Sequence, residues 1–81
     1  MRGDCVTVSA AYDELNDRQV FVAFHEKKKI FLRSVTGCFL ARNWTRNIRR
    51  AALWRDGEIA AEILSEKGFK IQRRFDLCKV K

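Results

Sequence analysis

The sequence predicts an α+β fold, in which a small antiparallel β-sheet of four to five strands carries one principal α-helix packed on one face. Three observations support this prediction. Hydrophobic residues alternate with a period of two near the start of the chain and again after Gly68. Between these regions, residues 56–67 carry hydrophobic residues at helical spacing, bounded by a capping aspartate and a glycine. The length of 81 residues fits one small hydrophobic core, so residues 1–81 are assigned to a single domain.

The first predicted strand covers residues 5–10. Its hydrophobic residues Val6 and Val8 share one side, which is the pattern of a strand with one buried face. Residues 12–17 are rich in turn-forming residues and are expected to connect this strand to the next one. The same stretch allows an alternative, in which Ser9 caps one or two turns of helix.

The second predicted strand covers residues 19–25. It is hydrophobic on both faces and rich in β-branched and aromatic residues, which is typical of a central strand covered on both sides. After a charged connection, residues 30–35 and 38–45 are expected to pair as a hairpin. The turn between them contains Gly37, which can adopt the positive φ that a tight turn requires.

Alternation along this hairpin mixes aromatic and basic side chains. Phe31 shares a face with Arg33 on the first arm, and Trp44 shares a face with Arg42 and Cys38 on the second. Pairing of the two arms would therefore place an arginine beside an aromatic ring on at least one solvated face of the sheet.

Two helical segments are expected after the hairpin. Thr45 is placed to cap a short helical turn over residues 46–53. Asp56 caps the principal helix, which ends before Gly68, a residue suited to the left-handed conformation that often follows a helix. The apolar stripe of the principal helix is predicted to consist of Ile59, Ala60, Ile63 and Leu64.

Residues 69–80 alternate again and form the last predicted strand. Ile71 and Phe75 face one way, with Arg73 as the exception on that side, and the residues between them face water. With connections this short, neighbouring strands are expected to pair mostly antiparallel, and the principal helix covers one face of the sheet. The other face must then be solvated or used for binding.

Positive charge is concentrated in residues 27–55, which we call the basic segment. This segment holds nine cationic side chains and no carboxylate, against a net charge of +7 for the whole chain. The cations are Lys27, Lys28, Lys29, Arg33, Arg42, Arg46, Arg49, Arg50 and Arg55. Such a cluster indicates an anionic partner, because Lys and Arg gain affinity for polyanions by releasing counterions, and interleaved aromatic rings can stack on bases.

The candidate binding residues are eight of these cations and one tryptophan. They are Lys27, Lys28, Lys29, Arg33, Arg42, Arg46, Arg49, Arg50 and Trp44. Arg46, Arg49 and Arg50 are spaced i, i+3 and i+4, so a helical segment would present them on one face. We expect this arginine face to contribute more to a specific contact than the lysines, because a guanidinium group loses less freedom per hydrogen bond. The alternative is that Trp44 and the other aromatic residues of the segment belong to the core.

The sequence contains no pattern typical of a catalytic, metal or cofactor site. His25 is the only histidine, and no neighbouring residue is placed to orient and tune it as a general base. Cys5, Cys38 and Cys78 form no close pair, so reduced thiols are expected rather than a disulfide framework or a zinc site. The chain is therefore expected to be non-enzymatic, with no metal and no cofactor.

The hydropathy of the chain bears on its location. The start of the sequence has no hydrophobic run behind a basic patch, and no run approaches the roughly 20 apolar residues that cross a bilayer. We expect a soluble protein in the cytoplasm of a host cell, without a membrane partner. The sequence makes no prediction of the oligomeric state.

The middle and end of the chain resemble a layout found in small phage and mobile-element proteins. In that layout a hairpin is followed by an alanine–x–x–aromatic stop, a helix that opens on a polar residue, and a closing strand. Residues 51–54 (AALW), 56–58 (DGE) and 68–69 (GF) carry the resemblance here. Several anti-CRISPR proteins have this size and general shape, so the resemblance implies a binding inhibitor rather than an enzyme.

Together, the charge and the resemblance predict a small basic binding protein that inhibits a host nucleic-acid machine, such as a CRISPR-Cas effector, by binding it electrostatically. The partner would be a protein or nucleoprotein complex with an acidic or nucleic-acid surface. The alternative is a stand-alone DNA- or RNA-binding protein, although RNA-recognition, KH and helix-turn-helix motifs are all missing. A role in assembly is a third interpretation, which a discrete large oligomer would favour.

Overall fold

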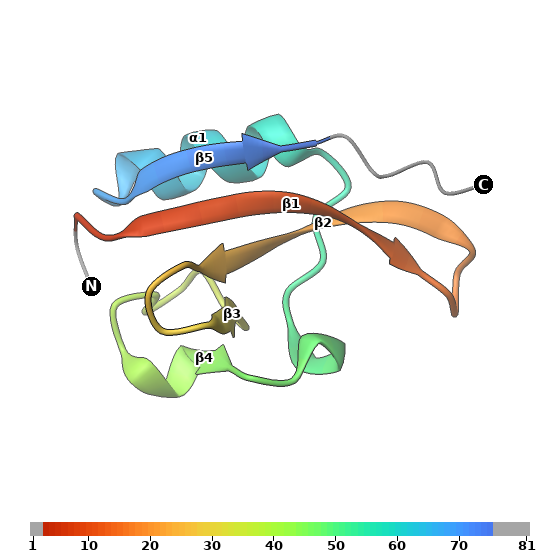
Figure 1. The fold of residues 1–81 in the computed structure, drawn as a ribbon, viewed down its shortest axis with the longest axis horizontal. Helices are drawn as coiled ribbons and strands as arrows, with labels where there is room; N and C mark the ends of the chain where they lie inside the picture. The colour runs from red at the N-terminus through yellow and green to blue at the C-terminus, as the bar shows by residue number, and fades with distance from the viewer. Residues whose placement is uncertain (1–2, 76–81) are drawn as a thin grey trace.

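The computed structural model describes residues 3–75 and shows a five-stranded sheet with one α-helix on it (Figure 1). The strands are β1 (Cys5–Asp13), β2 (Arg18–His25), β3 (Ile30–Leu32), β4 (Trp44–Thr45) and β5 (Lys70–Arg74). The helix is α1 (Gly57–Glu66), and the 3₁₀ turns are η1 (Ala41–Asn43) and η2 (Ile48–Arg50). The described residues therefore adopt the α+β fold that the sequence predicts.

The strand order is β4-β3-β2-β1-β5, so β2 lies in the centre of the sheet, as its hydrophobic sequence predicts. Three of the four neighbouring pairs are antiparallel, but β5 runs parallel to β1, which makes the sheet mixed. The cause is the connection through α1. The chain turns at Gly68 and enters β5 from the end at which β1 begins, where the backbone N–H of Lys70 donates to the Asp4 carbonyl at 2.9 Å.

The register of the strands gives the sheet two different faces. Val6, Val8 and Ala23 lie on the side of α1, which we call the helix face. The buried core on this face is formed by Val6, Val8, Ala23, Leu32, Cys38, Trp44, Ala60, Ala61, Leu64 and Phe69. The opposite side, which we call the open face, carries the alternate residues, among them Val22 and Phe24. α1 does not cover the open face, and the segment around η2 covers part of it.

Both ends of α1 follow from local signals in the sequence. The Asp56 carboxylate accepts hydrogen bonds from the backbone N–H groups of Glu58 and Ile59, and Gly68 has a φ of 105° just after the C-cap. The predicted cap and terminator are thus confirmed. The predicted apolar stripe is rotated, because Ala61 is buried whereas Ile59 is 51% exposed. Small alanines let the helix approach the sheet closely, which turns the larger isoleucine outward.

The predicted hairpin of the basic segment is only partly present. Gly37 has the positive φ of 70° that the turn requires, and β3 pairs antiparallel with β4. The second arm is not a continuous strand, however, because residues 38–43 fold over the helix face before β4 begins. The amide of Asn43 donates to the carbonyls of Thr36 and Gly37 at 3.3 and 2.7 Å and holds this loop in place.

The hairpin of β1 and β2 is longer than the sequence predicts. β1 continues to Asp13, and residues 14–17 form the turn into β2. The amide of Asn16 donates to the Asp13 carboxylate at 2.9 Å, and Asp17 adopts a φ of 53° in the turn. The alternative of a helix capped by Ser9 is therefore wrong, because the residues after Ser9 continue the strand and pair with β2.

β5 is the described part of the last predicted strand, and residues 76–80, which include Cys78, lie outside the described residues. Ile71 packs against the core, as predicted. Arg73, the predicted exception on this side, reaches α1 instead of entering the core. Its Nε and Nη2 donate to the two carboxylate oxygens of Glu58, each at 3.0 Å, and this ion pair explains a charge on the helix face.

Candidate binding surface

The basic segment forms one side of the molecule. In Figure 1, residues 27–55 run through β3, β4 and both 3₁₀ turns at the edge of the sheet away from β5. All nine cations of the segment are exposed. Within residues 3–75, the ion pairs are Asp13–Arg18, Asp4–His25 and Glu58–Arg73. None of them involves a cation of the basic segment, so its positive charge is not neutralised by the carboxylates of the described fold.

The three lysines Lys27, Lys28 and Lys29 lie in the turn between β2 and β3. His25 holds this turn, because its carbonyl accepts from the backbone N–H of Lys29 at 2.8 Å and its ring Nδ1 accepts from the backbone N–H of Lys28 at 3.1 Å. Lys29 has a φ of 59°, and its ammonium group lies 6.0 Å from the centre of the Phe24 ring. The exposed lysines thus extend from a turn whose backbone is fixed.

The structure gives His25 an orienting neighbour that the sequence does not predict, because the Asp4 carboxylate lies 2.9 Å from its ring. It is fully buried, and because Nδ1 accepts a backbone hydrogen bond, Nε2 carries the ring hydrogen and donates it to Asp4 at 2.9 Å. This hydrogen bond is the main reason that the pKa of Asp4 lies below its ordinary value. Desolvation opposes the effect, and the charge of Lys27 adds a smaller lowering.

The arginine face predicted for a short helix is wrong in its geometry. η2 is a single 3₁₀ turn, and its cap is Asn47, whose side chain accepts from the backbone N–H of Arg49 at 3.0 Å. Thr45, the predicted cap, accepts instead from the backbone N–H of Asn47 at 3.0 Å. These side chains compete with helical hydrogen bonds and keep the segment irregular. Arg46 therefore precedes the turn, and only Arg49 and Arg50 lie within it.

Trp44 belongs to the core, so its assignment as a binding residue is wrong. It is 6% exposed, its Nε1 donates to the Cys38 carbonyl at 2.7 Å, and its ring meets those of His25 and Phe69 at steep angles. β4 lasts only two residues and places the indole on the helix face, opposite Leu32 of β3. The predicted common face of Cys38, Arg42 and Trp44 is not formed, because residues 41–43 are a 3₁₀ turn and only Arg42 of the three is exposed.

The two remaining predicted arginines lie on either side of the loop that follows β3. Arg33 comes directly after the strand, and its backbone N–H donates to the Asn43 carbonyl at 2.7 Å. Arg42 lies in η1. Both side chains are exposed, so they extend the cationic surface along the β3–β4 edge.

The open face carries an aromatic pair that the sequence analysis identifies only in part. Phe24 of β2 and Phe31 of β3 are directly opposed in register, with ring centres 5.0 Å apart, and both are half-buried. Phe31 lies on the open face, so it can belong to the solvated face on which the sequence predicts an aromatic ring beside an arginine. Phe24 does not stand out in the sequence, because both faces of β2 are hydrophobic. Alternation along β2 is the pattern that assigns it to the same face as Val22.

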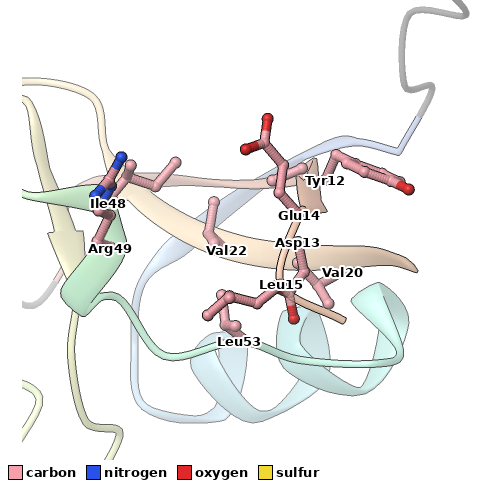
Figure 2. A pocket seen from close by; sticks show the side chains of 10 residues that line it. Tyr12, Asp13, Glu14, Leu15, Val20, Val22, Ile48, Arg49 and Leu53 are labelled. Atoms are coloured by element: carbon pink, nitrogen blue, oxygen red, sulfur yellow. The ribbon is translucent and has the colours of Figure 1, made fainter. Parts of the chain in front are cut away.

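Further along β2, the open face contains a hollow with a volume of about 640 Å³ (Figure 2). It is bordered by the end of β1, the following turn, η2 and the chain after η2. Val22 lies between Arg49 on one side and Glu14 on the other, and the aliphatic side chains of Leu15 and Leu53 lie below it in the view. The sequence could not predict this hollow, because its walls come from four separate segments.

The cysteine thiols and the potential metal ligands of residues 3–75 do not form a cluster. Among residues 3–75, no group of three or more His, Cys, Asp or Glu side chains is placed to hold a metal ion. Cys5 is exposed and Cys38 is buried, and both are unpaired thiols. None of the helices in this part of the chain is long and apolar enough to span a membrane.

Comparison of the chain with protein-family models, with curated proteins and with solved structures finds no match. The function is therefore inferred from the residues of the chain itself. Two features stand out in the described fold, namely the unneutralised cations of the basic segment and the open face with its aromatic pair and hollow.

Proposed function

We propose that this chain is a small, non-enzymatic binding protein that attaches to an anionic surface of a protein or nucleoprotein complex. The observation that carries the proposal is the arrangement of charge in the basic segment. All nine cations of the segment are exposed, and within residues 3–75 none of them forms an ion pair with a carboxylate. An anionic partner would supply the missing carboxylates or phosphates and gain affinity and association rate from the complementary potential.

A protein surface is favoured as the partner by the hydrophobic residues near these cations. Ile48 and Leu53 are 46% and 50% exposed, and they lie in or just after the turn that carries Arg49 and Arg50. Exposed aliphatic side chains beside arginines are typical of protein interfaces, whereas nucleic-acid contacts rely on aromatic stacking and phosphate binding. The resemblance to anti-CRISPR proteins adds that the target would be a host nucleic-acid machine, such as a CRISPR-Cas effector, whose action the bound protein obstructs.

A second candidate function is direct binding of DNA or RNA. The observation that favours it is the aromatic pair on the open face, where Phe24 and Phe31 are 5.0 Å apart and Lys29 lies over Phe24. A half-buried aromatic pair beside a cation can stack bases and contact phosphate at the same place. This candidate makes a different prediction for salt dependence and for the role of the phenylalanines.

The experiment that separates the two candidates is an anisotropy titration with random single- and double-stranded oligonucleotides at about 50 and about 200 mM salt. The proposal predicts weak oligonucleotide binding that does not depend on Phe31. Direct nucleic-acid function predicts tight binding that falls steeply with salt and is lost in Phe31→Leu.

The protein target is then sought by affinity capture from host lysate, with a charge-reversed Arg46/Arg49/Arg50→Glu variant as the matched bait. A partner held by the wild-type chain and not by this variant supports the proposal. Equal capture by both baits would contradict it.

A further inference from the structure

We infer that the hollow on the open face is the docking site for a protein segment that carries a large aliphatic side chain next to carboxylates. This inference rests on the proposed function and names the chemistry that the partner presents at one place. It is carried by the shape and hydrophobic lining of the hollow, by the charges on its two sides, and by the charge of the chain as a whole.

Hydrophobic exposure is concentrated at the hollow. The large hydrophobic residues that are exposed in residues 3–75 are Tyr12, Leu15, Phe39, Leu40, Ile48, Leu53 and Ile59. Four of these seven line the hollow, together with the buried Val20 and Val22. Leu15 is 92% exposed at the tip of the β1–β2 turn. Clustering of this kind on a small domain marks an interaction site, because isolated exposed hydrophobic residues would be scattered over the surface.

The two sides of the hollow carry opposite charges. Arg49 borders it from η2, and Glu14 borders it from the β1–β2 turn (Figure 2). Neither residue has an ion-pair partner among the described residues, whereas the neighbouring Asp13 is already engaged by Asn16 and Arg18. Arg46 and Arg50 do not line the hollow, but both are exposed and add positive charge around η2. An occupant with carboxylates toward η2 therefore complements the stronger of the two charged sides.

The charge of the chain argues against a second copy as the occupant. Each copy carries a net charge of +7, so two copies brought together at the η2 side would place like charges in contact. A nucleic acid is also a poor match, because Tyr12 is the one aromatic residue that lines the hollow and it adjoins Asp13 and Glu14, whose carboxylates repel phosphate.

The form of the hollow favours a side chain on a protein segment over a free small molecule. Its volume of about 640 Å³ lies within the range of ligand sites, which is roughly 300–1,000 Å³. Ligand sites enclose their ligand and place a few polar groups around it, whereas this hollow is bounded by half-exposed Ile48 and Leu53. Such a rim suits an anchor residue of a partner surface, surrounded by a ring of charge contacts.

The test uses three fluorescent peptides as probes for the intact chain. The first has a central leucine flanked by glutamates, the second replaces the leucine with alanine, and the third replaces the glutamates with lysines. We expect the first peptide to bind about tenfold more tightly than either of the others. In NMR spectra, the shifted backbone amides should be those that surround Val22, Ile48 and Leu53.

Matched variants locate the binding at the hollow. Ile48→Ala should weaken the first peptide about five- to tenfold, whereas Ile59→Ala, which truncates an isoleucine of similar exposure on α1, should leave binding unchanged. Leu53→Ala is paired in the same way with Leu40→Ala, since their exposures are 50% and 47%. Arg49→Glu should shift preference toward the lysine peptide, and the charge-matched Lys67→Glu should not.

Three results would overturn the inference. One is equal binding of the leucine and alanine peptides, or no binding of either up to millimolar concentration. Another is an equal effect of the paired isoleucine variants. The third is a dimer of the wild-type chain that Ile48→Ala disperses, which would make the hollow a self-association surface. Binding of poly-glutamate is measured in parallel. If poly-glutamate binds but the leucine peptide binds no better than the alanine peptide, only the inference fails. If poly-glutamate does not bind either, the proposed function fails as well.

Discussion

The indole Nε1 of Trp44 donates a 2.7 Å hydrogen bond to the backbone carbonyl of Cys38, and both residues are buried on the helix face. This bond joins the end of the loop that covers the sheet to its beginning. It gives the loop a buried polar contact within the core, and the aromatic ring of Phe69 packs beside it. A tryptophan within the most basic part of the sequence thus serves stability rather than binding.

Trp44→Phe should lower the free energy of unfolding by about 1–3 kcal/mol, because the buried Cys38 carbonyl loses its donor. The matched control is Trp54→Phe. The Nε1 of Trp54 is buried without a hydrogen-bond partner among the described residues, so this substitution removes no hydrogen bond and should cost less. Urea unfolding followed by far-ultraviolet circular dichroism measures both variants. A larger loss for Trp54→Phe would contradict the role assigned to the Trp44 hydrogen bond.

The parts of the fold that could be predicted from sequence are those set by local interactions. Asp56 and Gly68 mark the ends of α1 because a cap and a left-handed glycine act on the residues next to them. The parallel pairing of β5 with β1 could not be predicted in this way, since it depends on where α1 returns the chain. Residues 38–43 alternate like a strand, but burial of Cys38 and the amide bonds of Asn43 fold them into a loop.

The candidate site was predictable to the extent that it depends on charge. The sequence identifies the exposed cations of the basic segment, because charged side chains in a small domain remain at the surface. It could not decide between core and surface for Trp44, since hydrophobic periodicity over two residues of strand carries no information. It could not reveal the hollow either, which exists only once η2 crosses the open face beside Val20 and Val22.

The arginines near η2 should matter more for an acidic partner than the lysine turn does. Arg46/Arg49/Arg50→Ala and Lys27/Lys28/Lys29→Ala each remove three cations, so their net charges are matched. We expect the arginine variant to lose more affinity for poly-glutamate, because guanidinium groups form paired hydrogen bonds with carboxylates and because Arg49 borders the hollow. Anisotropy at low salt measures the affinity, and circular dichroism checks that both variants fold. Equal losses would mean that net charge alone determines binding.

The contact between Asp4 and His25 should make the fold sensitive to acid. The pKa of Asp4 is lowered in the folded chain, so its contribution to stability is complete above its ordinary value of 3.8 and is lost as the pH falls through the lower folded value. Wild-type stability should therefore exceed that of Asp4→Asn at pH 6, and the difference should shrink below pH 3.8. Urea midpoints across this range measure it. A difference that stays constant with pH would show that the carboxylate charge is not involved.

Gly57, the first residue of α1, should resist replacement by alanine, although alanine is the better helix former. A Cβ at this position would lie 2.8 Å from Phe21 Cδ1 and 2.8 Å from Phe75 Cε1, which is closer than van der Waals contact allows. We expect Gly57→Ala to destabilise the fold by about 1–3 kcal/mol, against a gain in helix propensity of about 1 kcal/mol or less. The control Ser65→Ala, at an exposed position of α1, should change stability by less than about 0.5 kcal/mol. Thermal or urea unfolding that ranks the two variants in the opposite order would contradict this steric explanation.

The parallel pairing of β1 with β5 has a consequence for synthesis on the ribosome. β1 and β2 leave the exit tunnel one after the other and can form a hairpin at once, but the second edge of β1 has no partner until β5 emerges. The hydrophobic side chains of Val6 and Val8 also remain exposed until α1, which covers them, has emerged. At about 5–20 residues per second, the nascent chain carries an unpaired strand edge and a bare hydrophobic face for several seconds. A ribosome that stalls between β3 and β5 would therefore hold a chain prone to aggregation, and nascent-chain chaperones are expected to bind at that stage.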